Sequence, residues 1–139
     1  MDIQIYEDLK ECFKKYFANL NLPKDYNADI VEYEPANPKY PFVKFVEIRN
    51  VPYEEHRGRL ETIANLGYRV DVYAKTTNKT SKSTIARTLA KHCDDFLVGC
   101  KRLRQVSWNA LENDGVNGDL YHIVITYNAP YFEQRRRIL

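Results

Sequence analysis

The chain has 139 residues, of which 44% are hydrophobic, so it is long enough for one domain with a real core and short for two. Its 21 Lys and Arg residues against 19 Asp and Glu residues leave a formal net charge of +2, which indicates no particular charged partner. No stretch holds the ~18 apolar residues of a membrane-spanning helix, and the acidic, amphipathic N-terminus lacks the pattern of a signal peptide, so we expect a cytosolic protein.

The first part of the chain predicts one helix and one or two strands. Residues 5–20 predict the helix, because apolar side chains recur at intervals of three and four residues until Pro23 ends the pattern. Residues 28–42 hold a short alternating run that is interrupted by three prolines. Residues 41–51, PFVKFVEIRNV, predict a better strand, apolar on both sides as in the middle of a covered sheet.

The second part predicts a loop, three strands and a second helix. Residues 52–67 are polar and loop-like, and residues 68–76 alternate as a half-buried strand. The second helix follows from about Thr80, with Gly99 placed as the glycine that ends it. Residues 100–111 and 119–130 predict two further strands, joined by a turn at 112–118 whose Asp-Gly and Asn-Gly pairs favour positive φ.

This order of elements predicts the fold class. Because long alternation of strand and helix is missing, we expect an α+β fold, with an antiparallel or mixed sheet of four to five strands and two helices packed on one face. No internal repeat and no linker divides the chain, so residues 1–139 are expected to form a single domain.

Residues 70–86, VDVYAKTTNKTSKSTIA, have the outline of a phosphate-binding loop between a strand and a helix. Such a loop needs glycines that let backbone N–H groups approach phosphate oxygens, and residues 76–84 contain none. The stretch therefore predicts a solvated turn, in which Asn78, Thr80 or Ser81 caps the following helix.

No group of residues predicts catalysis or metal binding. Glu54–His56 does not match the H-E-x-x-H motif, and His92 and Cys93 are neighbours that point about 100° apart on a helix. The three cysteines have no metal-binding spacing, and we expect them to be reduced. We therefore predict no enzyme, no cofactor and no metal; a catalytic site assembled by tertiary contacts alone stays open.

The aromatic and basic residues indicate binding rather than catalysis. The chain holds 11 Tyr, a residue that is enriched at protein interfaces. Basic clusters lie at Lys101–Arg104 and Arg135–Arg137, and a sheet face with Arg69, Tyr73, Tyr121 and Tyr127 would let bases stack. A small nucleic-acid-binding domain is therefore an alternative, although solvated charge or a protein contact explains both clusters as well.

The order and the hydrophobic pattern of the segments resemble a known family. The runs that carry the likeness are YPFVKFVEIRN, RLETIANLGYRVDVYAKT, STIARTLAKHCDDFLVG and CKRLRQVSWNALENDGVNGDLYHIVITYNAPY. Together they resemble the tail-terminator proteins of tailed bacteriophages, also called tail-completion or head-to-tail joining proteins. The likeness covers nearly the whole chain but includes no invariant chemical motif.

The resemblance implies a structural virion protein. Members form a ring, commonly a hexamer, that caps the tail tube, ends its polymerisation and joins the tail to the head or neck. The implied partners are further copies of the chain, the tail-tube protein and a neck or connector protein, with DNA passing through the lumen without specific binding and no membrane involved. The implied location is the virion tail, assembled in the host bacterial cytoplasm.

Three polar or terminal segments are expected to contact neighbours in such a ring. They are the loop 53–59, the turn 112–119 and a C-terminal arm 131–139 placed after the last predicted strand. Their candidate contact residues are Tyr53, Glu55, Arg57, Arg59, Asn113, Asp114, Asn117, Tyr131, Phe132, Arg135, Arg136 and Arg137. The alternative for the arm is that it folds back on its own subunit.

Overall fold

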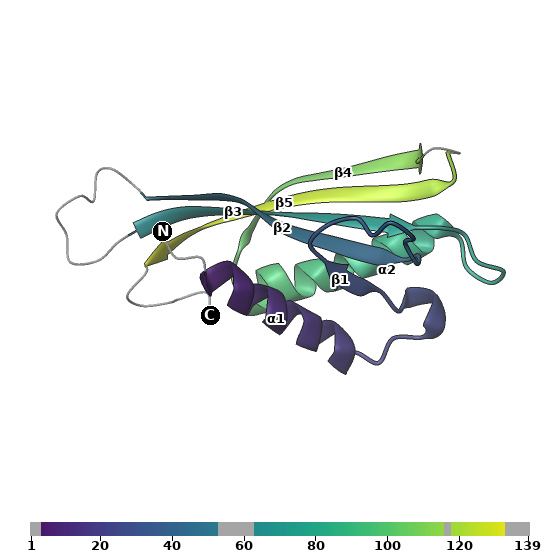
Figure 1. The fold of residues 1–139 in the computed structure, drawn as a ribbon, viewed down its shortest axis with the longest axis horizontal. Helices are drawn as coiled ribbons and strands as arrows, with labels where there is room; N and C mark the ends of the chain where they lie inside the picture. The colour runs from purple at the N-terminus through teal and green to yellow at the C-terminus, as the bar shows by residue number, and fades with distance from the viewer. Residues whose placement is uncertain (1–3, 53–62, 116–117, 133–139) are drawn as a thin grey trace.

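The computed structural model describes residues 4–52, 63–115 and 118–132 (Figure 1). In chain order the elements are α1 (Gln4–Asn19), the short helix η1 (Lys24–Tyr26), β1 (Asp29–Val31), β2 (Phe42–Pro52), β3 (Ile63–Ala74), α2 (Lys82–Asp94), the π-helical turn η3 (Asp95–Cys100), β4 (Arg104–Asp114) and β5 (Leu120–Phe132). No helix among these residues is long and apolar enough to cross a membrane.

The strands form one five-stranded sheet in the order β1-β2-β3-β5-β4. β1 pairs with β2 in parallel, and the other three pairs are antiparallel. Figure 1 shows α1 and α2 on the same side of the sheet, with β4 at the far side from α1. The predicted α+β fold, with a mixed sheet and two helices on one face, is confirmed.

α1 supplies a large part of the core through its apolar stripe. Ile5, Leu9, Phe13 and Phe17 are buried, as the three- and four-residue spacing predicted. The Phe13 ring lies 5.1 Å from the ring of Phe96, which is stacked on it, and 5.1 Å from the ring of Phe45, which it meets at its edge. Burying each such side chain contributes roughly 1.5–3 kcal/mol, so packing holds this helix on the sheet.

α2 begins and ends with identifiable caps. The Ser81 hydroxyl accepts from the backbone N–H of Thr84, so Ser81 is the cap among the three predicted candidates. The predicted stop at Gly99 is wrong, because the chain continues through Gly99 as a π-helical turn. Arg102 instead adopts positive φ, 60°, and the cluster 101–103 lies in the turn before β4 rather than along a strand.

Two strands are longer than the sequence predicted. β3 begins at Ile63, so residues 63–67 are strand and not loop. β5 continues to Phe132, so Tyr131 and Phe132 do not follow the last strand, as predicted, but pair with Ala64 and Ile63. Both errors have one cause: ladder hydrogen bonds join backbones, so pairing extends as far as the two strands run side by side, whatever their side chains.

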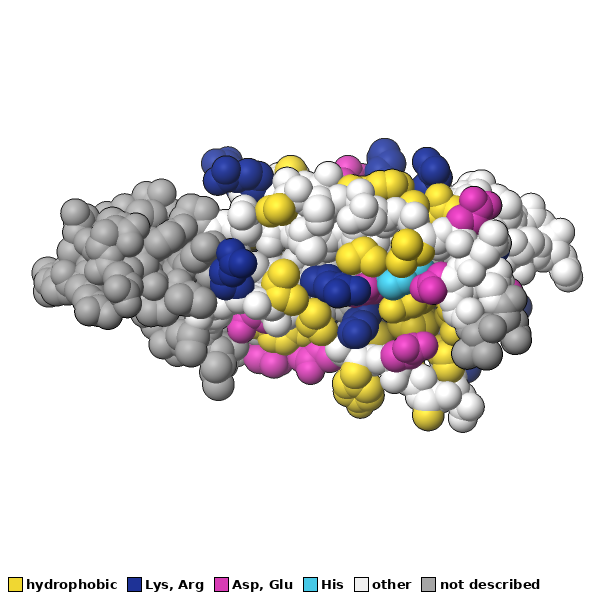
Figure 2. Space-filling view, turned by 90° about the horizontal axis from the view of Figure 1, so that it is seen from above, with side chains coloured by type: hydrophobic (Ala, Val, Ile, Leu, Met, Phe, Trp, Pro, Cys, Tyr) yellow, Lys and Arg dark blue, Asp and Glu magenta, His cyan; other side chains and the backbone are white. Residues whose placement is uncertain are grey.

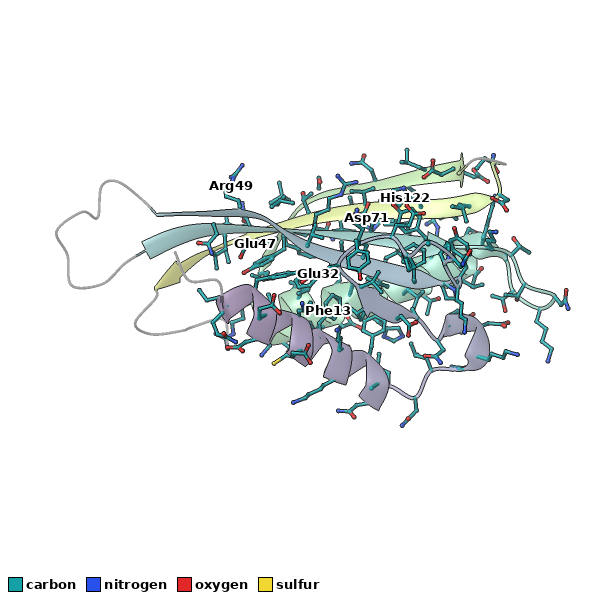
Figure 3. The ribbon with its side chains drawn as sticks, viewed as in Figure 1. Phe13, Glu32, Glu47, Arg49, Asp71 and His122 are labelled. Carbon is teal, nitrogen blue, oxygen red and sulfur yellow. The ribbon has the colours of Figure 1, made fainter. Side chains whose placement is uncertain are left out.

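No described helix covers the second face of the sheet. β2 was predicted to lie in a covered sheet because it is apolar on both sides, and Phe42 on the uncovered face is indeed only 2% exposed. It is shielded by an aromatic stack instead of a second layer: its ring lies 4.8 Å from that of Tyr73, which lies 4.1 Å from the ring of His122. Figure 3 shows His122 and Asp71 on this side and Phe13 between the sheet and α1.

Candidate self-association site

The sheet has two lateral edges, and within the described part of the chain both offer unpaired backbone. β4 is one edge along its 11 residues, with β5 as its neighbour on the inner side. At the other edge, β1 pairs only with Phe42–Lys44, so among the described residues no strand covers the outer side of β2 from Phe45 onward. Free N–H and C=O groups on a strand edge are ready to pair with another chain.

β4 lacks most of the features that protect natural edge strands. Its sequence, RQVSWNALEND, contains no Lys and no Pro. Its apolar side chains are exposed: Val106 by 58%, Trp108 by 39% and Leu111 by 48%. Irregular pairing near Gln105 and beyond Leu111 leaves a regular stretch at residues 107–111. This stretch is an exposed, partly apolar edge of the kind that binds another strand.

β4 is also held firmly on its inner side. The Gln105 amide donates to both carboxylate oxygens of Asp94 on α2, at 3.1 and 2.9 Å. The hydroxyls of Ser107 and Thr126 lie 2.6 Å apart. Arg87 of α2 lies 5.9 Å above the Trp108 ring and donates to the Tyr121 hydroxyl at 3.2 Å. An edge that is already ordered loses little conformational entropy when it binds.

A groove lies at the opposite edge, between α1 and β1. It consists of two hollows, about 440 and 350 Å³ in volume, that share Lys14, Ile30 and Val31 in their walls. Tyr33, which is 75% exposed, and Pro35 line the smaller hollow. The groove is therefore largely apolar, with charged side chains at its rim.

Charged side chains form a network on the helix-free face. His122 Nε2 lies 2.7 Å from Asp71 Oδ1, and His122 Nδ1 lies 2.8 Å from Asp114 Oδ2. Arg69 donates to both carboxylate oxygens of Asp71 at 2.9 Å. Figure 2 looks onto this face and shows basic and acidic side chains gathered around a histidine. The network ties the end of β4 to the centre of the sheet.

The contacts in this network lower the pKa values of its two carboxyl groups. Burial raises the pKa of the Asp71 carboxyl, but hydrogen bonds from His122 and Arg69 outweigh it and hold the pKa below its ordinary value. The Gly115 N–H, and after it His122, lower the pKa of Asp114. Both carboxylates are thus ionised at neutral pH and accept hydrogen bonds. Both ring nitrogens of His122 lie within hydrogen-bond distance of a carboxylate oxygen.

The structure describes few of the predicted contact residues. Asn113 has positive φ, 60°, and its Oδ1 accepts from Lys82 Nζ at 2.9 Å, while Asp114 is held by His122. Both are therefore tied to their own subunit. Tyr131 and Phe132 are in β5. The other candidates, Tyr53, Glu55, Arg57, Arg59, Asn117, Arg135, Arg136 and Arg137, lie outside the described residues.

The predicted aromatic and basic face is not formed. Arg69 and Tyr73 lie on the helix-free face, whereas Tyr121 and Tyr127 are buried in the core on the other side. The side chains that do share the helix-free face with Arg69 include Lys44, Arg49 and Arg104, as the register shows. Among the described residues, no group of three or more His, Cys, Asp or Glu side chains is placed to hold a metal ion.

Sequence reasoning missed the β4 edge and the His122 network. Residues 100–111 were predicted to be extended, and β4 covers Arg104–Asp114. The order of strands in a sheet is a tertiary property, so the sequence could not show that this strand is an edge. Asp71 and His122 are 51 positions apart and meet only because β3 pairs with β5.

In comparisons with known proteins, no protein-family model and no curated protein matches the chain.

Proposed function

We propose that this chain is a structural virion protein that assembles into a ring, caps the tail tube of a phage or phage-like particle and joins the tail to the head or neck. The observation that carries the proposal is the exposed, firmly held edge of β4, with Val106, Trp108 and Leu111 open to solvent. The role at the tail tube rests on the resemblance of nearly the whole chain to tail terminators. The proposal includes no catalytic step and no cofactor.

The two edges of the sheet favour a ring over a two-fold dimer. A two-fold contact uses the same patch on both subunits, whereas a head-to-tail contact joins two different patches and forms a ring if its rotation closes. Here one edge presents projecting apolar side chains and the other presents a groove. Two unlike surfaces at opposite ends of one sheet are what a head-to-tail assembly requires.

The ends of a ring subunit have to meet other proteins along the tail axis. The end of β4 is tied to the rest of the subunit, by Lys82 on Asn113 and by His122 on Asp114. A strand end that is already tied in place loses less conformational entropy when the tail-tube or neck protein binds it.

The first test is the mass of the full chain in solution, by light scattering on a sizing column at low and moderate salt. We expect a defined multiple of the 16.4 kDa subunit, close to six copies, with rings visible by electron microscopy. A monomer at every concentration and salt contradicts the proposal.

The capping role has a separate test. Added to the polymerising tail-tube protein from the same particle, the ring is expected to shorten the tubes in proportion to its concentration and to decorate one end only. Tubes of unchanged length contradict the capping role but not ring formation.

A second candidate function, a small nucleic-acid-binding domain, is favoured by one observation. Lys44, Arg49 and Arg104 share the helix-free face, and none of them is paired with a carboxylate among the described residues. This function predicts salt-dependent binding of single-stranded DNA that weakens as the three side chains are changed to Gln one after another. Unchanged binding in the triple variant contradicts it.

A further inference from the structure

The two edges of the sheet are matched in direction. β1 runs parallel to β2, and each further neighbour in the order β2-β3-β5-β4 is antiparallel to the one before it, so β4 runs opposite to β1. A second copy that lies beside β4 in the same orientation therefore places its β1 antiparallel to β4. Antiparallel strands form the more stable backbone ladder.

The side-chain faces are matched as well. One row of paired residues crosses all five strands on the helix-covered face. It consists of Ile30, Val43, Val72, Ile123 and Ala110. Trp108 lies on the same face of β4, in the row of paired residues that contains Phe45 on β2. Glu32 is the first residue after β1, and the β1 register places it beside this row. With the two copies in register, Trp108 of one lies at the smaller hollow of the next, which Glu32 and Tyr33 line.

One pair of opposite charges, Arg87 and Glu32, faces across the two edges, beside Lys10 and Lys14 in the same hollow. Arg87 lies over Trp108, and no carboxylate is paired with it among the described residues. Glu32, on the rim of the groove, is 40% exposed and is paired with Lys10, which also contacts Glu7. The register that seats Trp108 brings Arg87 of one copy toward Glu32 of the next, where opposite charges favour this orientation.

The distribution of exposed apolar side chains favours this arrangement over pairing of β4 with itself. In the described part of the chain, Val98, on the turn η3, is the one exposed large hydrophobic residue that does not lie on β4 or at the other edge. Val106, Trp108 and Leu111 lie on β4, and Tyr33 and Ile48 lie at the other edge. A two-fold β4 contact covers the first set and leaves the second in water. A head-to-tail contact brings the two sets together.

We infer that the groove between α1 and β1 receives β4 of a second copy of this chain, with Trp108 seated in the groove and the sheets of the two copies joined into one. This inference rests on the proposed ring and specifies the contact that builds it. It assigns Trp108 and Arg87 to one side of the interface and Ile30, Glu32 and Tyr33 to the other.

The tryptophan itself is the probe for this contact. The chain has a single Trp, so selectively excited fluorescence reports on Trp108 alone. In a dilution series followed in parallel by light scattering, the assembled full chain is expected to emit at shorter wavelength than the dilute subunit. Its quenching constant with acrylamide is expected to fall by about half or more, because the centre of an interface excludes water.

Substitutions test the same contact by a second route. Trp108→Glu is expected to raise the dissociation constant at least about 30-fold, as for a central aromatic contact. The matched control is Val98→Glu, which adds the same charge at a side chain of nearly equal exposure, 40% against 39%, on the turn η3 and not on an edge strand. The control is expected to assemble like the unchanged protein. Circular dichroism checks that both variants are folded.

A charge exchange keeps the test independent of Trp108. Arg87→Glu and Glu32→Arg are each expected to weaken assembly, and the double variant is expected to recover most of it, because the pair is restored at every contact of the ring. If the chain assembles while acrylamide still quenches Trp108 as in the dilute subunit, or if Trp108→Glu does not change assembly, this contact is wrong. The proposed ring is not contradicted by either result. A chain that never assembles overturns the ring and the contact together.

Discussion

At the scale of single residues, the contacts of His122 make the stability of the fold depend on pH. The pKa values of Asp71 and Asp114 lie below their ordinary value of 3.8 in the folded chain. A carboxyl with a lowered pKa contributes stability above its unfolded pKa and loses it as pH falls through the folded value. We therefore expect the free energy of unfolding, measured with urea, to fall steeply below about pH 4.

The variant Asp114→Asn is the check on this assignment. It removes one of the two carboxylates, so the fall in stability below about pH 4 is expected to be shallower than in the unchanged protein. An identical pH dependence in the variant contradicts a contribution from Asp114.

Removing His122 tests the network from its centre. Asp71 is fully buried, and among the described residues His122→Ala leaves it with Arg69 as its side-chain donor. Removing a hydrogen-bond partner from a buried polar group costs about 1–3 kcal/mol, and because Arg69 remains we expect a loss within this range. Urea unfolding measures it, with His92→Ala on α2 as the matched control. A loss no greater than that of the control contradicts the role of the network.

At the scale of elements, the helices were predictable and the limits of the strands were not. The stripe of α1 follows from local periodicity, and Ser81 could be recognised as a cap candidate because its role depends on neighbouring residues alone. The added length of β3 and β5 depends on the partner strand, and the π-helical turn through Gly99 carries no signal in residue type. The candidate site was missed for the same reason, since Trp108 is exposed only through the position of β4 in the sheet.

The cap of α2 gives a prediction at this scale. Ser81→Ala removes the acceptor for the backbone N–H of Thr84, and we expect a loss of about 1 kcal/mol in the free energy of unfolding. Ser83→Ala, at the second residue of the helix, is the matched control and is expected to change stability by a few tenths of a kcal/mol at most. Equal effects of the two substitutions would mean that the cap contributes nothing measurable.

At the scale of the whole molecule, the C-terminal segment can be separated from the fold. β5 ends at Phe132, which pairs with Ile63, so a chain that stops after Phe132 keeps every described strand pair. If residues 133–139, the part of the predicted arm 131–139 that follows β5, contact a neighbouring subunit, the shortened chain unfolds at the same temperature as the full chain but assembles more weakly. Thermal unfolding and light scattering on the same samples measure both quantities. Normal assembly rules out the arm, whereas a lower unfolding temperature indicates that the segment packs against its own subunit.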